Sequence, residues 1–384
     1  MCGIYLDYQS AMPVDPRVRE FADRYLTQEF GNPSSLHSVG LGAKAAVEEA
    51  RANVAALINA EDPNTIIFTG GATESNNLAI RGTALRNSSK GKRVLTSAIE
   101  HISVLNAMKD LQKNGFDLSL VPVDHTGLVD LDALEKSVTK DTVVTSIMYA
   151  NSEIGTIEPV KEISEIVHKK GMYLHVDAVA AEGRVPVDVQ KDGIDLLTIS
   201  SNDIYGPQGA GALYINPKVR LQPVVVGGGQ ERGLSPGTEN IFAIAGFGEA
   251  ARLARAEIQT ESERLRPIRD GLIEEILKIE DSYLTGHPDK RLPHHASFRF
   301  SRIEGESILL TMDAMFNIQV STGSACSSRT LEPSHVLLAI GLKHEEAHGS
   351  MVLTAGRSNT IDQVPVVAKA VSQTVQRLRA LSPL

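Results

Sequence analysis

The chain has no tryptophan, few aromatic residues (4%) and only two cysteines among its 384 residues. Two cysteines exclude the disulfide framework of a small secreted protein and are typical of a reducing compartment, so we expect a cytoplasmic protein. The N-terminus lacks the cationic start and apolar stretch of a signal peptide, and no apolar run reaches the ~18 residues of a membrane span. The net charge of -9 leaves no basic face for phosphate backbones. We expect neither a membrane nor a nucleic acid among its partners.

What the sequence does have is an alternation of short β-branched runs with amphipathic helical stretches. The runs predict buried strands at residues 65–68, 142–148, 173–176, 195–200 and 211–215. The stretches predict helices at residues 43–60, 103–113 and 160–170. Strand–helix alternation over about 200 residues predicts an α/β fold, with a mainly parallel sheet that helices cover on both faces.

The pattern changes after residue 239. A long charged helix is predicted over about residues 241–279, followed by a strand at 296–300, a helix at 304–313 and a C-terminal helix at 364–381. These elements predict a smaller α+β unit. Because 384 residues are too many for one simple core, we predict two domains. The large domain covers residues 17–260, and the small domain joins residues 1–16 to residues 261–384.

A glycine-rich segment, Gly70-Gly71-Ala72-Thr73-Glu74, follows a predicted strand and begins a predicted helix. Backbone amides at such a helix start, together with the Thr73 hydroxyl, could bind a phosphate. The alternative is a turn in which Thr73 only caps the helix. The local residues do not decide between these two interpretations.

Two further polar residues follow predicted strands, at the edge where open α/β sheets bind ligands. Asp177 could keep a pyridinium nitrogen protonated, which would make a pyridoxal phosphate ring an electron sink. His101 could stack on such a ring. The alternatives are a loop-capping aspartate and a structural histidine, which are the commoner outcomes for isolated residues.

Cys326 lies in the small-residue segment Ser321-Thr322-Gly323-Ser324-Ala325-Cys326-Ser327-Ser328. Nothing there is large enough to bury the sulfur, so we expect an accessible thiol on a mobile loop. Such a thiolate can attack sulfur, carry a persulfide or ligate a soft metal. An idle surface cysteine is the alternative, but exposed free thiols are a liability.

The segment His344-Glu345-Glu346-Ala347-His348 matches the H-E-x-x-H pattern of zinc proteases. Gly341 precedes it and Gly349 ends it, so only a very short helix fits between them. We see no clear third ligand and therefore do not predict a zinc site there.

Taken together and in order, these segments resemble the cysteine desulfurases of the NifS/IscS type, which are class V aminotransferases with the fold-type I architecture of pyridoxal phosphate enzymes. The resemblance runs nearly end to end. The matching motifs are Tyr5-Leu6-Asp7-Tyr8, Gly31-Asn32-Pro33-Ser34-Ser35, Gly71-Ala72-Thr73-Glu74, Glu100-His101, Asn151-Ser152-Glu153-Ile154-Gly155, His175-Val176-Asp177-Ala178, Tyr205-Gly206-Pro207, Gly227-Gly228-Gly229, Gly323-Ser324-Ala325-Cys326 and Leu331-Glu332-Pro333-Ser334.

The resemblance implies a homodimer that takes sulfur from cysteine as a persulfide and delivers it to iron–sulfur cluster assembly. It implies that the large domain binds pyridoxal phosphate and that the small domain carries the Cys326 loop. Carried over by position, the cofactor-binding residues are Ala72, Thr73, His101, Ser152, Asp177, Ser200, the residue at position 203, and Thr238, which would reach the phosphate in the partner subunit. Cys326 and His101 are the candidate catalytic residues.

The departures from this family lie in the active site. The family has Ser-Gly-His-Lys before its Tyr-Gly-Pro motif, whereas this chain has Ser200-Ser201-Asn202-Asp203. That lysine forms the internal aldimine and moves the substrate's α-proton. Asp203 can do neither, and no lysine occurs between Lys191 and Lys218. Three lesser contacts also differ: Ser152 stands at an asparagine position, Ala180 at a glutamine position, and Val352 where an arginine clamps the substrate carboxylate.

Two functional hypotheses follow. The first is an iron–sulfur assembly protein with lost or weak cofactor chemistry, whose Cys326 carries sulfur or ligates a cluster donated to an IscU-like scaffold. Only Cys2 and Cys326 are available, so a [2Fe-2S] cluster would have to be shared with that scaffold. The alternative is an active desulfurase that uses non-covalently bound pyridoxal phosphate to convert cysteine into alanine and a persulfide. The sulfur source is cysteine or sulfide. A related enzyme, such as a selenocysteine lyase or a small aminotransferase, is a third and weaker possibility.

Overall fold

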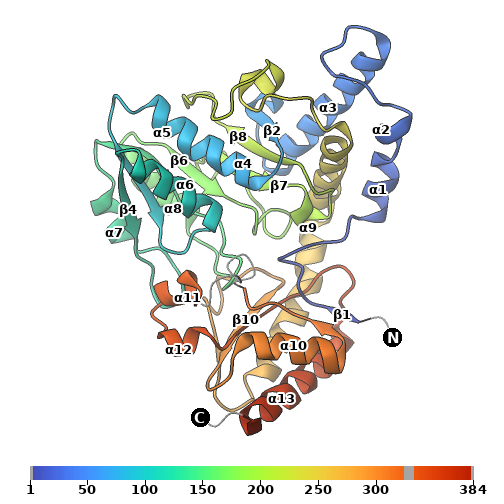
Figure 1. Ribbon diagram of the computed structural model, residues 1–384, viewed down its shortest axis with the longest axis vertical. Coiled ribbons are helices and arrows are strands. Elements are labelled where there is room, and N and C mark those ends of the chain that lie inside the picture. Colours follow the sequence, from blue (N-terminus) through green and yellow to red (C-terminus); the bar gives the residue numbers. More distant parts are fainter. Residues whose placement is uncertain (1–2, 324–332, 382–384) are drawn as a thin grey trace.

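The computed structural model describes residues 3–323 and 333–381. Its largest feature is a seven-stranded sheet in the order β2-β8-β7-β6-β5-β3-β4 (Figure 1). The strands in that order are β2 (Ile66–Thr69), β8 (Gly211–Ile215), β7 (Leu196–Ser200), β6 (Leu174–Asp177), β5 (Thr142–Ser146), β3 (Arg93–Ser97) and β4 (Asp117–Val121). All neighbouring pairs are parallel except those of β8, which runs antiparallel to β2 and β7. The predicted mainly parallel sheet is therefore confirmed.

Helices cover both faces of this sheet. Successive residues of a strand point to opposite faces, and both faces carry buried apolar side chains that pack against helices. On one face Ile66 and Phe68 pack in a core with α3 (Ser38–Leu57), α7 (Leu131–Ser137), α8 (Val160–Lys169) and the first part of α9 (Ile241–Ile276). On the other face Ile67 and Val94 belong to cores with residues from the chain between α4 (Ala72–Asn77) and α6 (Ile102–Lys113). The π-helix Leu78–Gly82 and α5 (Thr83–Arg86) complete that layer.

A second and smaller unit contains a three-stranded antiparallel sheet, in the order β12-β10-β9. Its strands are β12 (Ser350–Thr354), β10 (His295–Phe300) and β9 (Ser282–Leu284), and β1 (Ile4–Tyr5) pairs separately with β11 (Ile318–Gln319). The helices α10 (Gly305–Phe316) and α13 (Val364–Leu381) pack with the end of α9 in its core. The remaining α-helices among the described residues are α1 (Pro16–Ala22), α2 (Arg24–Thr27), α11 (His335–Ala339) and α12 (His344–Ala347).

The long helix α9 contributes to both cores. Its residues up to Ala254 pack in the core of the large sheet, whereas Leu265 to Ile276 pack in the core of the small unit. The predicted domain boundary at residue 260 falls between these two groups and stays a prediction. The N-terminal strand β1 lies with the small unit, as Figure 1 shows. None of the helices in the described part of the chain combines the length and apolar character that a membrane crossing needs.

Candidate functional site

A cavity of about 420 Å³ lies where the carboxyl ends of β2, β3, β5, β6 and β7 meet. Parallel strands end at the same edge of a sheet, so polar residues that follow them converge there. Five of the predicted site residues line this cavity together: Ala72, His101, Ser152, Asp177 and Asp203. The small unit closes it from the other side with residues that include Ser321, Gly323 and Val352.

Asp177 is the last residue of β6 and is buried. Its Oδ2 atom accepts a hydrogen bond from the Asn76 side-chain amide (2.8 Å), and its Oδ1 atom accepts one from the Val179 backbone amide (3.1 Å). These two donors fix the orientation of the carboxylate. Asn76 is fully buried in α4, so the helix that follows the glycine-rich turn is tied to the end of β6.

His101 occupies the N-cap position of α6. Its Nδ1 atom accepts a hydrogen bond from the Ser103 backbone amide (3.2 Å), which leaves the proton of the neutral ring on Nε2. The Ser103 hydroxyl lies 2.7 Å from the same Nδ1 atom and also accepts from Asn76 (2.9 Å). His101 and Asp177 therefore belong to one hydrogen-bonded chain that passes through Ser103 and Asn76.

The glycine-rich turn before α4 depends on its lack of side chains. Gly71 has a φ of 152°, a conformation that residues with a side chain rarely adopt. A Cβ atom on Gly211 of the neighbouring strand would lie 2.6 Å from the Gly71 carbonyl carbon. The backbone of β8 at Gly211 therefore packs directly against the backbone of this turn. Thr73, in the first turn of α4, is exposed and lies outside the residues that line the cavity.

Asp203 lies in a short 3-10 turn, Asn202–Ile204, directly after β7. Its Oδ2 atom accepts a hydrogen bond from the Asn202 side chain (2.8 Å), whose own oxygen accepts from the Ser200 hydroxyl (2.8 Å). Burial raises the pKa of Asp203 to about 7; the Ser200 hydroxyl and the Arg184 charge oppose this rise, and the charge of Asp177 adds to it. Asp203 is therefore only partly ionised at neutral pH.

A second carboxyl group, that of Glu182, lies next to Asp203. Glu182 is 1% exposed, and its Oε1 atom accepts a hydrogen bond from the Ser200 backbone amide (2.5 Å). Its Oε2 atom is buried without a hydrogen-bond partner among the described residues. Burial, followed by the charge of Asp203, raises the pKa of Glu182 well above its usual value. Glu182 was not predicted as a site residue, because its only signal in the sequence is its place directly after the small apolar run from Ala178 to Ala181.

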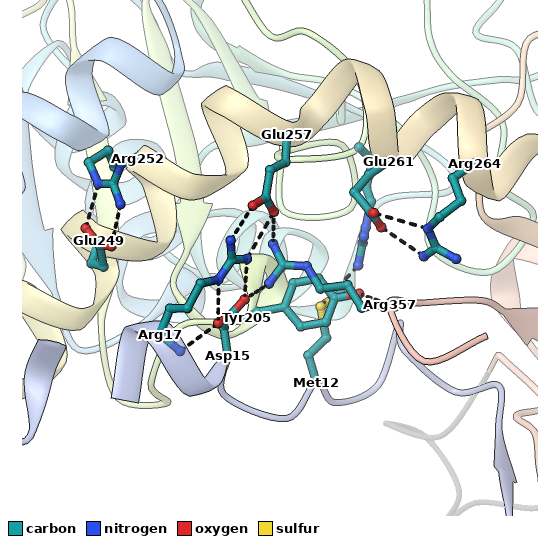
Figure 2. A network of polar contacts seen from close by, with 11 residues as sticks. Met12, Asp15, Arg17, Tyr205, Glu249, Arg252, Glu257, Glu261, Arg264 and Arg357 are labelled. Carbon is teal, nitrogen blue, oxygen red and sulfur yellow. Dashed lines mark hydrogen bonds and ion pairs between the residues drawn. The ribbon is translucent and has the colours of Figure 1, made fainter. Parts of the chain in front are cut away.

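The turn that carries Asp203 is attached to several distant segments by a polar network (Figure 2). Tyr205 has a left-handed φ of 65°, and its hydroxyl accepts a hydrogen bond from the Arg357 backbone amide (3.1 Å). The Arg357 guanidinium lies 4.2 Å from the Tyr205 ring centroid and pairs with Glu257 of α9 (2.7 Å) and with Asp15. Arg17 bridges the same two acids. The network thus joins the Asp203 turn to the N-terminal segment, to α9 and to the small unit.

Two more carboxyl groups line the cavity, those of Glu100 and Glu153. Glu100 is fully buried and accepts hydrogen bonds from the Ser97 hydroxyl (2.6 Å) and the Met148 backbone amide (2.8 Å). Burial raises the pKa of Glu100 to about 8. Glu153 accepts a hydrogen bond from the Ser334 hydroxyl (2.5 Å), and burial raises its pKa to about 7. Both acids are therefore largely or partly protonated at neutral pH.

The other predicted site residues have different positions. Ser200 is buried behind the cavity, where its hydroxyl holds Asn202. Thr238 is exposed and does not line the cavity. Cys326 lies outside the described residues, as does the metal-ligating role predicted for it. In the described ranges 3–323 and 333–381, no group of three or more His, Cys, Asp or Glu side chains is arranged to bind a metal ion.

The H-E-x-x-H segment forms the four-residue helix α12 (His344–Ala347). The rings of His344 and His348 lie 4.9 Å apart between centroids. No third ligand completes a metal site among the described residues. This motif therefore offers no support for a zinc enzyme.

The Aminotransferase class-V family matches residues 4–365. The chain is 56% identical to cysteine desulfurase IscS 1 of Archaeoglobus fulgidus, over 99% of both chains, and 47% identical to cysteine desulfurase IscS of Methanosarcina thermophila, over 100% of this chain and 94% of that one. Among solved structures, a NifS-like protein superposes with a TM-score of 0.91 at 33% identity, over 98% of this chain and 100% of that one. The chain therefore belongs to the class-V aminotransferase family, among relatives named cysteine desulfurase IscS.

Proposed function

We propose that this chain acts in iron–sulfur cluster assembly, where Cys326 carries sulfur or contributes a cluster ligand to an IscU-like scaffold. In this proposal its amino-acid chemistry is lost or weak, because Asp203 stands at the position of the lysine that would form an imine with the cofactor. The carrying observation is that Asp203 lines the same cavity as His101 and Asp177. None of the described residues that line the cavity is a lysine or an arginine.

The described residues fit the ring of pyridoxal phosphate but not its covalent attachment. Asp177 is fixed by two donors at the end of β6, as a partner for a ring nitrogen must be. His101 belongs to the same hydrogen-bonded chain and lines the cavity. The backbone at Gly71 is open, because a Cβ atom there would meet nothing within 4 Å. We therefore propose that the cofactor binds here without a covalent bond.

The substrate side of the cavity also lacks the groups that amino-acid chemistry needs. Val352 of β12 is 3% exposed and lines the cavity, where it offers no charge to an α-carboxylate. Ser152 and Ala180 line the same cavity with short side chains. The carboxyl groups of Asp203, Glu100 and Glu153 would repel a substrate carboxylate whenever they are ionised.

The segment that contains Cys326 begins and ends beside the cavity. Gly323 lines the cavity on one side of this segment, and on the other side the Ser334 hydroxyl donates to Glu153 (2.5 Å). This placement of the flanking residues supports the proposal that the Cys326 thiol acts both at the cavity and on a scaffold protein bound outside it. A [2Fe-2S] cluster needs about four protein ligands, so Cys326 would share such a cluster with the scaffold.

We also propose that the chain forms a homodimer. Apolar side chains are exposed along the segment that contains α2 and the start of α3, and others are exposed in the loop before Gly227, at the top of the view in Figure 1. The most exposed of them are Leu26 (58%), Phe30 (59%), Leu36 (90%) and Val226 (87%). The two segments are neighbours, because Pro33, Ser34 and Gly229 line one surface pocket. A second copy of the chain would remove these side chains from water and would bring Thr238 toward the partner's cavity.

The first experiment measures the release of alanine and sulfide from cysteine under anaerobic conditions with added pyridoxal phosphate. We expect little turnover by the natural chain and little rescue in Asp203→Lys, because Val352 still provides no carboxylate clamp. The double variant Asp203→Lys/Val352→Arg is expected to gain activity. Asp141→Lys, at an exposed position, is the charge-matched control. Turnover by the natural chain at ordinary enzyme rates, about 1 per second or more, would refute the proposal and favour a desulfurase with non-covalent pyridoxal phosphate.

The second experiment tests the role of Cys326. The chain and an IscU-like scaffold are purified together anaerobically, and iron, sulfide and the visible spectrum are measured with the natural chain and with Cys326→Ala. We expect an iron–sulfur spectrum that depends on Cys326, with sulfide as the sulfur source. A complex without iron, or one that Cys326→Ala leaves unchanged, would contradict this role.

A further inference from the structure

The cavity has an unbalanced set of charged groups. Glu100, Glu153, Asp177 and Asp203 line it, and none of the described lining residues is a lysine or an arginine. Glu182, behind Asp203, adds a fifth carboxyl group. The interior of a protein tolerates several carboxyl groups only when they are protonated, hydrogen-bonded or paired with cations. The cavity is therefore suited to a ligand that brings positive charge.

The hydrogen bonds show which carboxylate is available to such a ligand. Asp177 accepts from two donors, and each lining glutamate accepts from hydroxyl or amide donors of its own. Asp203 accepts from the side chain of its neighbour Asn202, and its charged partner Arg184 acts on it only through space. Among the carboxyl groups in the cavity, Asp203 and Glu153 have no backbone donor, and Asp203 is the one that follows β7 at the position of the family's lysine.

One buried oxygen in the cavity wall points to the same conclusion independently. Glu100 is fully buried and lines the cavity, and its Oε2 atom has no hydrogen-bond partner among the described residues. Unpaired buried oxygens cost free energy, and a bound group that donates hydrogen bonds would remove part of this cost.

We propose that the cavity selects the amine form of the cofactor, pyridoxamine phosphate, over the aldehyde form, with Asp203 as the partner of the ligand's ammonium group. The positive charge that a lysine would supply from the protein then comes from the ligand. Asp177 and His101 bind the ring in either form, so they do not distinguish the two. Glu182 lies behind Asp203 and does not line the cavity, so it does not touch the ligand. This inference concerns the cavity alone and is independent of the proposed role of Cys326.

The test is a binding measurement on the purified full-length chain at one fixed pH near neutrality. Isothermal titration gives the Kd values of pyridoxamine phosphate, pyridoxal phosphate and pyridoxine phosphate. Pyridoxine phosphate has a neutral hydroxyl in place of the ammonium group and cannot form imines with surface lysines, so it isolates the effect of charge. We expect pyridoxamine phosphate to bind at least about tenfold more tightly than pyridoxine phosphate, as charge-assisted hydrogen bonds do.

Two variants separate selectivity from general affinity. In the nearly isosteric Asp203→Asn, the preference for the amine is expected to fall to about twofold or less, because the charge pair is gone. In Asp177→Asn, all three ligands are expected to weaken together while the preference remains. Equal Kd values for pyridoxamine and pyridoxine phosphate on the natural chain would overturn the inference, as would no binding of either. These outcomes need no variant, so a folding defect in Asp203→Asn does not affect them.

Discussion

The ion pair between Arg51 and Glu231 completes the open edge of the large sheet. β2 is an edge strand, so its outward backbone groups have no neighbouring strand. The Glu231 Oε2 atom accepts from the Phe68 backbone amide (2.7 Å), and Arg51 Nη1 donates to the Ile66 carbonyl (2.9 Å). The two side chains also bind each other through both carboxylate oxygens (2.7 and 2.8 Å). The pair thus takes the place of a missing strand, just before the turn at Gly71.

We predict that removing either partner strongly destabilises the protein. The side chains of Arg51 and Glu231 are only 9% and 4% exposed, so each variant leaves a largely buried charge. Breaking such a pair costs about 3–5 kcal/mol. In Glu231→Ala the Phe68 amide also loses its acceptor. Glu48, which is half-exposed, keeps part of its contact with Arg51.

The measurement is a double-mutant cycle of Arg51→Met, Glu231→Leu and the double variant. Urea unfolding is followed by far-UV circular dichroism, because the chain has no tryptophan. We expect a coupling energy of about 2–3 kcal/mol, since the double variant leaves no unpaired charge. Hydrogen exchange at the Phe68 amide gives a local reading that does not depend on two-state unfolding.

The control is the pair Arg252–Glu249 on α9, which is also bidentate (2.7 and 2.8 Å) but has its arginine 54% exposed (Figure 2). Its coupling energy is expected below about 1 kcal/mol, because water screens the charges. If the effects at Arg51 and Glu231 add within about 0.5 kcal/mol, the pair does not complete the sheet edge as argued.

Three further predictions follow from single contacts. The hydrogen bond to Asp195 (2.7 Å) raises the pKa of His168 against the opposing effect of burial, so its stabilisation is present below the unfolded value of about 6.5 and is lost as pH rises through the folded pKa. The stability difference between the natural chain and Asp195→Asn, measured by urea unfolding, should shrink with rising pH; a constant difference contradicts this. Burial raises the pKa of Glu182, so the natural chain should lose stability as pH rises above about 4.5, and Glu182→Gln should flatten that loss in the same assay. Gly211→Ala should cost about 1–3 kcal/mol and weaken cofactor binding, because its Cβ would meet the Gly71 carbonyl carbon; unchanged Kd values would show that the turn adapts.

Much of the fold could be predicted from local patterns. The strand at residues 211–215 and the helix at residues 364–381 have their predicted bounds in the structure. The direction of β8 was not predicted. Only ten residues separate it from β7, which is too short for the crossover that a parallel neighbour requires. Strand β4 was missed because Asp117, Ser119 and the exposed Leu120 make an edge strand that is neither apolar nor cleanly alternating.

The candidate site was predicted where a short motif carries it and missed where neighbours come from elsewhere in the chain. Asp177 ends a strand, and His101 and Asp203 follow strands, so sheet geometry brings the three residues to one cavity. Glu182 follows no strand end and belongs to no motif. Glu182 matters because it is buried next to Asp203, and this proximity arises only in the folded chain.

The surroundings of Asp203 explain how the chain tolerates an acid at this position. Burial leaves the carboxyl group with a pKa of about 7, so much of it carries no charge near neutrality. Asn202 donates to it and is itself held by Ser200, so the turn supplies a neutral partner instead of a salt bridge. A lysine at this position could pair with the carboxyl groups of Asp177 and Glu182, whereas Asp203 is itself a carboxylic acid beside these two acids. A positively charged ligand would favour the ionised form of Asp203, which burial and the charge of Asp177 disfavour.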